Sequence, residues 1–94
     1  MRILKVNMPE TGSISVIGFT LSLVGQAHLF TSEEINIMMD DKVETTTNLK
    51  SLLGLFTNYW NSKSITLTIS GENEDYAYTK LSVIVPDLIK EYSK

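Results

Sequence analysis

Cysteine is absent from this sequence of 94 residues, and histidine and arginine occur once each, as His28 and Arg2. Without cysteine the chain forms neither a disulfide framework nor a thiolate metal site, and one histidine cannot make a histidine-rich site alone. The lack of cysteine also fits a cytoplasmic protein. We therefore expect no structural metal and no cofactor.

Positive charge and long apolar runs are also scarce. Eight lysine and arginine residues are outnumbered by eleven acidic residues, which gives a net charge of -3. The chain has no basic stripe for binding nucleic-acid phosphates or an acidic membrane surface. No stretch reaches the roughly 20 apolar residues of a spanning helix, and the first residues lack the apolar run of a signal peptide. We expect a cytoplasmic protein whose partners are neither nucleic acid nor membrane.

The hydrophobic content, 43% of the residues, is enough for one compact domain over residues 1–94 and too little for two. Residues 3–8 form a strand candidate that Pro9 ends. Apolar residues at helical spacing then predict a helix over residues 19–30.

The middle and later parts of the chain contain the other strand candidates. Residues 35–39 and 43–47 flank a polar turn at residues 40–42, which predicts an antiparallel hairpin. Residues 65–69 alternate strictly between apolar and polar, so one face of this strand meets a core while the other can face water.

Two further helices are predicted. One begins near Asn48 or Ser51, where either side chain can cap the first amides, and it ends near Trp60. The other follows the acidic residues at 72–75, whose charges complement the helix dipole. Pro86 interrupts its apolar pattern, which predicts a kink or a restart near Val85.

The resulting element order is β-α-β-β-α-β-α. Four strands of this size form one antiparallel sheet, and three amphipathic helices cover one face of it. The sequence therefore predicts the α+β class with a two-layer, open-faced sandwich.

Residues 48–54 read asparagine, leucine, lysine, serine, leucine, leucine, glycine. With the element order and the stretches at 35–37 and 65–72, this run resembles the HPr family of the bacterial sugar phosphotransferase system. The family run has the same pattern, and its serine is a regulatory phosphorylation site in many Gram-positive members. The resemblance implies an HPr-like fold and places Ser51 at that serine.

The resemblance fails where the family performs its carrier chemistry. That chemistry needs a histidine at the start of the first helix, just after the glycine matched by Gly12, with an arginine and a proline close behind. Residues 13–18 instead read serine, isoleucine, serine, valine, isoleucine, glycine, and the only arginine is Arg2. Imidazole is the phosphoryl-accepting nucleophile, and neither isoleucine nor valine replaces it. The resemblance thus implies a relative that has lost phosphocarrier activity and is not an enzyme.

Ser51 has two compatible interpretations, a helix cap or a regulatory phosphorylation site, because amides that a cap satisfies also bind phosphate oxygens. Leu52, Leu53 and Phe56 match a docking patch in the family, and Lys50 lies beside them. At helical spacing these apolar residues are alternatively part of the core. By resemblance the candidate partners are the HPr kinase/phosphorylase and a catabolite-control transcription factor.

Two other functions stay open. The chain is alternatively an active phosphocarrier with an unusual acceptor, Ser15 or His28, although His28 falls at the end of its helix, where phosphate binds poorly. A third possibility is a structural module that associates with itself through the exposed hydrophobic helix.

The remaining carboxylates do not indicate a site. The spacing of Glu33, Glu34, Asp40 and Asp41 matches no calcium loop, so solvated turns are expected for them. No nucleophile, base and orienting group can be assembled into a catalytic triad, and the chain has no glycine-rich phosphate loop.

Overall fold

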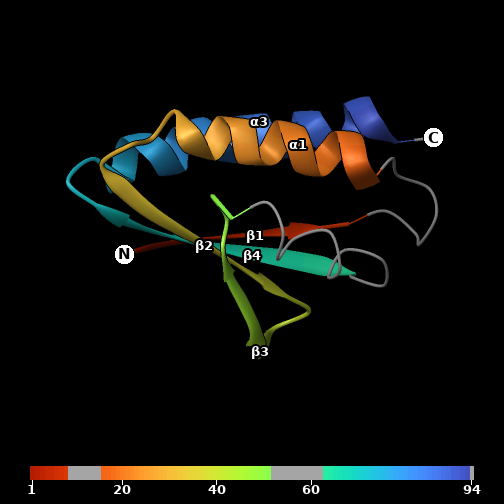
Figure 1. Ribbon diagram of the computed structural model, residues 1–94, viewed down its shortest axis with the longest axis horizontal. Helices are drawn as coiled ribbons and strands as arrows, with labels where there is room; N and C mark the ends of the chain where they lie inside the picture. Colours follow the sequence, from red (N-terminus) through yellow and green to blue (C-terminus); the bar gives the residue numbers. More distant parts are fainter. Residues whose placement is uncertain (9–15, 52–62, 94) are drawn as a thin grey trace.

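The computed structural model of the chain describes residues 1–8, 16–51 and 63–93. Its elements in chain order are β1 (Arg2–Asn7), α1 (Val16–His28), β2 (Glu33–Met39), β3 (Lys42–Asn48), β4 (Ser64–Gly71) and α3 (Glu74–Tyr92). The strands form one antiparallel sheet in the order β1-β4-β2-β3, and both described helices lie on one face of it (Figure 1). The α+β two-layer sandwich is thus confirmed for the described residues. The helix predicted to end near Trp60 lies outside them.

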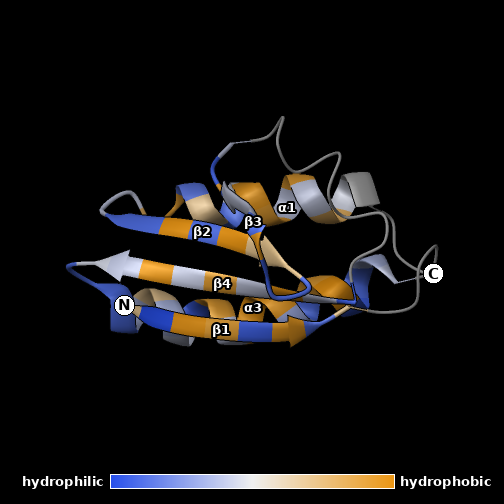
Figure 2. Cartoon of the chain, turned by 90° about the horizontal axis from the view of Figure 1, so that it is seen from below, coloured by the Kyte–Doolittle hydropathy of each residue, from blue (hydrophilic) through white to orange (hydrophobic). Residues whose placement is uncertain are grey.

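The central strand, β4, is the strand with the strictest sequence alternation. Ile65, Leu67 and Ile69 are fully buried, and Leu67 lies opposite Leu4 of β1 and Ile37 of β2. Figure 2, seen from the side away from the helices, shows β1, β4 and β2 side by side. The apolar face of β4 therefore forms the floor of the core, as alternation predicts.

The opposite face of β4 is less open to water than its sequence suggests. Thr66 is only 6% exposed, and its hydroxyl has no hydrogen-bond partner among the described residues. Register places Lys5 and Met38 on either side of Thr66, on the same face. The ammonium of Lys5 lies 2.8 Å from the carboxylate of Asp41, and this ion pair joins β1 to the turn after β2 on the same face of the sheet.

The hairpin of β2 and β3 turns through Asp40 and Asp41, whose φ angles are 51° and 60°. Two successive left-handed residues are typical of the type I′ turn, which aspartate tolerates better than most side chains. The predicted hairpin is confirmed, and it contains an irregularity that alternation does not predict. Ile37 pairs with Thr47, and Met39 pairs with Lys42. One residue lies between these paired positions on β2, whereas four residues, 43–46, lie between them on β3. The hydroxyl of Thr45 accepts a hydrogen bond from the Met39 amide at 2.8 Å and thereby stabilises this bulge.

Helix α1 begins at Val16, three residues before the predicted start, and passes through Gly18. A Cβ at Gly18 would lie 2.6 Å from the ring of Tyr92, near the end of α3. The hydroxyl groups of Ser22 and Tyr92 lie 2.7 Å apart, within hydrogen-bonding distance. Glycine lowers helix propensity, but here it permits the close approach of the two helices.

Helix α3 runs through Pro86 without the restart expected near Val85. Pro86 is exposed, whereas Leu81, Val85 and Leu88 form a buried stripe on both sides of it. Burial of this stripe offsets the backbone hydrogen bond that proline removes.

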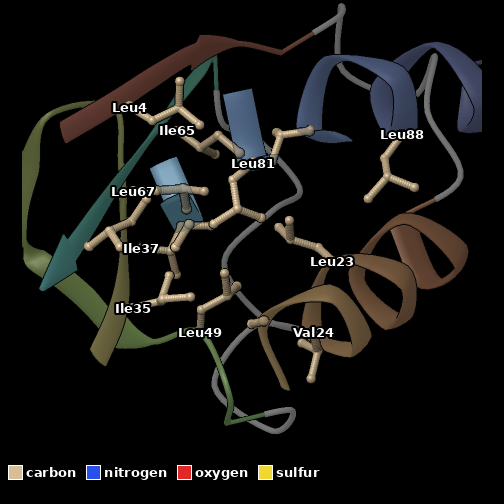
Figure 3. Packing of buried hydrophobic residues seen from close by; sticks show 14 of the residues in the cluster. Leu4, Leu23, Val24, Ile35, Ile37, Leu49, Ile65, Leu67, Leu81 and Leu88 are labelled. Carbon is tan, nitrogen blue, oxygen red and sulfur yellow. The ribbon is translucent and has the colours of Figure 1, made fainter. Parts of the chain in front are cut away.

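The core lies between this helical layer and the apolar face of the sheet. Figure 3 shows side chains of Leu23 and Leu81 from the helices facing those of Ile37 and Leu67 from the strands. Within the described ranges, no helix combines the length and the apolar character needed to cross a membrane.

Candidate functional site

Ser51 lies at the end of a tight turn that leaves the edge strand β3. The carbonyl of Asn48 accepts a hydrogen bond from the Ser51 amide at 2.9 Å, and the Asn48 side-chain oxygen accepts one from the Lys50 amide, also at 2.9 Å. The Asn48 side chain therefore forms an Asx turn, whereas the helix that it is predicted to cap lies outside the described residues. Ser51 itself is exposed. The turn presents its hydroxyl to solvent on a backbone that hydrogen bonds hold in place.

Leu49 anchors this turn from the core side. Its side chain is fully buried, and its amide donates to the Ile35 carbonyl at 2.8 Å. Figure 3 shows Leu49 near Ile35 on one side and Val24 of α1 on the other. Exposure thus rises along the turn, from the fully buried Leu49 through the half-buried Lys50 to the exposed Ser51.

Lys50, predicted to contact a partner, makes its observed contacts within the chain. Its ammonium donates to the carbonyls of Phe30 and Glu33, each at 2.9 Å, and the side chain is half-buried. Phe30 lies in the connection between α1 and β2, and Glu33 is the first residue of β2. Lys50 therefore ties the turn bearing Ser51 to a segment about 20 residues earlier in the chain.

The other predicted site residues lie elsewhere. Leu52, Leu53 and Phe56 are outside the described residues, as is Ser15, the alternative phosphoryl acceptor. His28 is exposed and is the last residue of α1.

The single arginine lies far from the start of α1. Arg2 pairs with Ile69 at the end of β4, lies 3.3 Å from the carboxylate of Asp75 and stacks over the ring of Tyr78. Figure 1 shows the N-terminal end, where β1 begins, and the first turn of α1 at opposite ends of the molecule. A phosphoryl-transfer site would require the arginine to lie close to the start of the helix. The fold therefore does not bring Arg2 and the start of α1 together.

Two carboxylates expected in solvated turns are instead structural, which corrects the sequence interpretation. Glu33 is only 5% exposed and accepts hydrogen bonds from the Ser32 hydroxyl at 2.7 Å and the Asn73 amide at 3.0 Å. The burial of Glu33 could have been predicted from the sequence, because alternate residues of a strand share a face and Glu33 precedes Ile35 and Ile37 at a spacing of two. The described part of the chain contains no cluster of three or more acidic, histidine or cysteine residues that could hold a metal ion.

Asp40 is the second of these carboxylates. Its Oδ1 accepts hydrogen bonds from the amides of Lys63 and Ser64 at 2.6 and 3.0 Å. Burial by itself would raise the pKa of Asp40, but these two amides, assisted by the charges of Lys42 and Lys63, lower it below its ordinary value. The two hydrogen bonds of Asp40 thus hold the hairpin turn against the start of β4.

Comparison with solved structures identifies this arrangement of strands and helices. HPr-C-His from Thermoanaerobacter tengcongensis superposes with a TM-score of 0.71 and 20% identity, covering 96% of this chain and 97% of that one. The chain has the HPr fold. The histidine-containing phosphocarrier protein of Mycoplasma gives a TM-score of 0.73 at 20% identity, covering 94% of this chain and 96% of its own.

A third HPr structure agrees. The phosphocarrier protein HPr from Bacillus anthracis strain Ames gives a TM-score of 0.60 at 21% identity, over 88% of this chain and 96% of that one. No protein-family model and no curated protein sequence matches the chain. Identity of this order establishes the HPr fold, and function must be argued from the residues of the site.

Proposed function

We propose that this chain is an HPr-like interaction or regulatory module without histidine phosphocarrier activity, and that Ser51 is its regulatory phosphorylation site. The position of His28 supports the first part most strongly. A phosphoryl acceptor is favoured at a helix start, where free amides and the positive end of the dipole hold the oxygens. His28 is the last residue of α1, where the dipole has the opposite sign.

The geometry of the Asn48–Ser51 turn supports the second part. Ser51 is exposed, and hydrogen bonds from its own amide and from the Lys50 amide to Asn48 fix the turn, so a kinase meets an accessible hydroxyl in a defined position. The proposed partner surface consists of Lys50, Leu52, Leu53 and Phe56. By resemblance, the HPr kinase/phosphorylase and a catabolite-control regulator in the cytoplasm are its partners.

Residue-resolved mass spectrometry after incubation with ATP and an HPr kinase tests the regulatory site. We expect one phosphate, on Ser51, and none in Ser51→Ala. Thr46→Ala is the matched control, because Thr46 is another exposed hydroxyl residue near the end of β3. Phosphate on Thr46, or an unmodified wild-type chain, would contradict the proposal for Ser51.

Incubation with phosphoenolpyruvate and the first enzyme of the phosphotransferase pathway tests the absence of carrier activity. We expect no label on the chain. Acid-labile label that disappears in His28→Gln would identify a phosphoimidazole, and acid-stable label lost in Ser15→Ala would identify a phosphoester. Either result would contradict the proposed loss of carrier function.

A further inference from the structure

The ammonium of Lys50 is a half-buried cation for which the described part of the chain offers no counter-ion. It contacts two backbone carbonyls, and none of the ion pairs in the described part includes it. The nearest acidic residue in this network is Glu33, whose carboxylate already accepts from Ser32 and Asn73. Carbonyl dipoles compensate a partly desolvated charge less well than an anion does.

We infer that Lys50 is the counter-ion of a phosphoryl group on Ser51, an inference that rests on the proposed phosphorylation of that serine. Lys50 directly precedes Ser51, and Asn48 fixes the backbone of both residues. An ammonium has three N–H donors, and two of those on Lys50 are engaged by the described residues. A phosphoryl group supplies close to two negative charges and three acceptor oxygens, so it satisfies the charge that the carbonyls leave uncompensated.

This pairing has a consequence outside the turn. The charge of the phosphoryl group draws the ammonium toward position 51 and away from the carbonyls of Phe30 and Glu33, so both existing hydrogen bonds weaken when Ser51 is modified. Glu33 in turn contacts the Asn73 amide at the start of α3. Phosphorylation at Ser51 therefore loosens the connection between α1 and β2, which carries the effect toward α3.

Phosphorus-31 NMR titration of a chain made with phosphoserine at position 51 during synthesis tests the pairing without any kinase. At low salt, an ammonium next to the phosphate lowers the pKa of its second ionisation by about half a pH unit or more. We expect this lowering in the wild type and in Lys50→Arg, and its loss in Lys50→Met. Lys42→Met, at an exposed lysine of the same hairpin, should titrate like the wild type.

A second measurement needs no variant. Carbonyl carbon-13 signals of Phe30 and Glu33 should shift when phosphoserine replaces Ser51, while that of Lys63, which accepts from the Met8 amide, should not. Equal phosphorus titrations in the wild type and a folded Lys50→Met would overturn the inference, as would unchanged Phe30 and Glu33 signals. A kinase that leaves Ser51 unmodified would defeat the proposed function instead, because the phosphate here is installed by synthesis.

Discussion

The carboxylate of Glu33 accepts a hydrogen bond from the backbone amide of Asn73 at 3.0 Å, although 40 residues separate them in the sequence. Asn73 is the N-cap of α3 and makes no side-chain capping bond of its own. Glu33 therefore supplies from β2 the acceptor that a capping-box glutamate supplies from within a helix. This contact joins the first residue of β2 to the start of α3.

Removal of the Glu33 acceptor should destabilise the chain. Glu33→Ala removes a buried, charged acceptor from both the Asn73 amide and the Ser32 hydroxyl, so we expect a loss of about 1–3 kcal/mol in the free energy of unfolding. Glu33→Gln keeps an acceptor and should lose less. Urea denaturation measures both, with the exposed Glu34→Ala as the control expected to stay within about 0.5 kcal/mol. Equal effects of Glu33→Ala and Glu34→Ala would contradict the capping role.

Asp40 should make the stability depend on pH. Its pKa is lowered in the folded chain, so its stabilising contribution is complete above the unfolded value of about 4 and is lost as pH falls through the folded value. Asp40→Asn tolerates the positive φ but cannot ionise. We expect the stability difference between wild type and Asp40→Asn to be larger at pH 7 than at pH 2.5. Urea denaturation at both pH values checks this, and the exposed Asp87→Asn should show a smaller change.

Two glycines should respond to alanine with opposite signs. Gly71 has a φ of 153°, and a Cβ there would lie 2.7 Å from the Ser32 carbonyl oxygen, so Gly71→Ala should destabilise by about 1–3 kcal/mol. Gly25 is an exposed position within α1 where a Cβ meets nothing within 4 Å. Gly25→Ala should therefore stabilise by about 0.5–1 kcal/mol. Thermal unfolding of both variants measures the difference, and a shift of the same sign in both would refute the steric argument.

Strand positions could be predicted because alternation reports directly on burial. Residues 65–69 alternate strictly, and the paired aspartates mark a turn that needs left-handed residues. The start of α1 was predicted too late because Gly18 lowers local propensity, whereas its contact with Tyr92 becomes visible only in three dimensions. Local pattern thus identifies elements, and tertiary contacts set several of their boundaries.

In the candidate site, too, local contacts could be predicted from the sequence and long-range contacts could not. A hydrogen bond from a nearby amide to the side-chain oxygen of Asn48 could be expected from its residue type, and in the structure the Lys50 amide donates it. The Lys50 contact with Phe30 joins residues 20 apart through a flexible side chain, and no periodicity encodes such a contact. Likewise, the continuity of α3 through Pro86 depends on a buried stripe that packs against other elements.

Thr66 offers a prediction in which removing a polar group stabilises the chain. Its hydroxyl is buried without a partner among the described residues, and an unsatisfied buried hydroxyl is unfavourable by about 1–3 kcal/mol. Thr66→Val keeps the β-branched shape and the strand preference while removing that hydroxyl. We expect Thr66→Val to raise the free energy of unfolding by about 1 kcal/mol. Thr68→Val, at the half-buried neighbouring position on the same face, should be near neutral because water already reaches its hydroxyl. Urea denaturation of the two variants decides the matter: a destabilised Thr66→Val would mean that the hydroxyl has a hydrogen-bonding partner in solution.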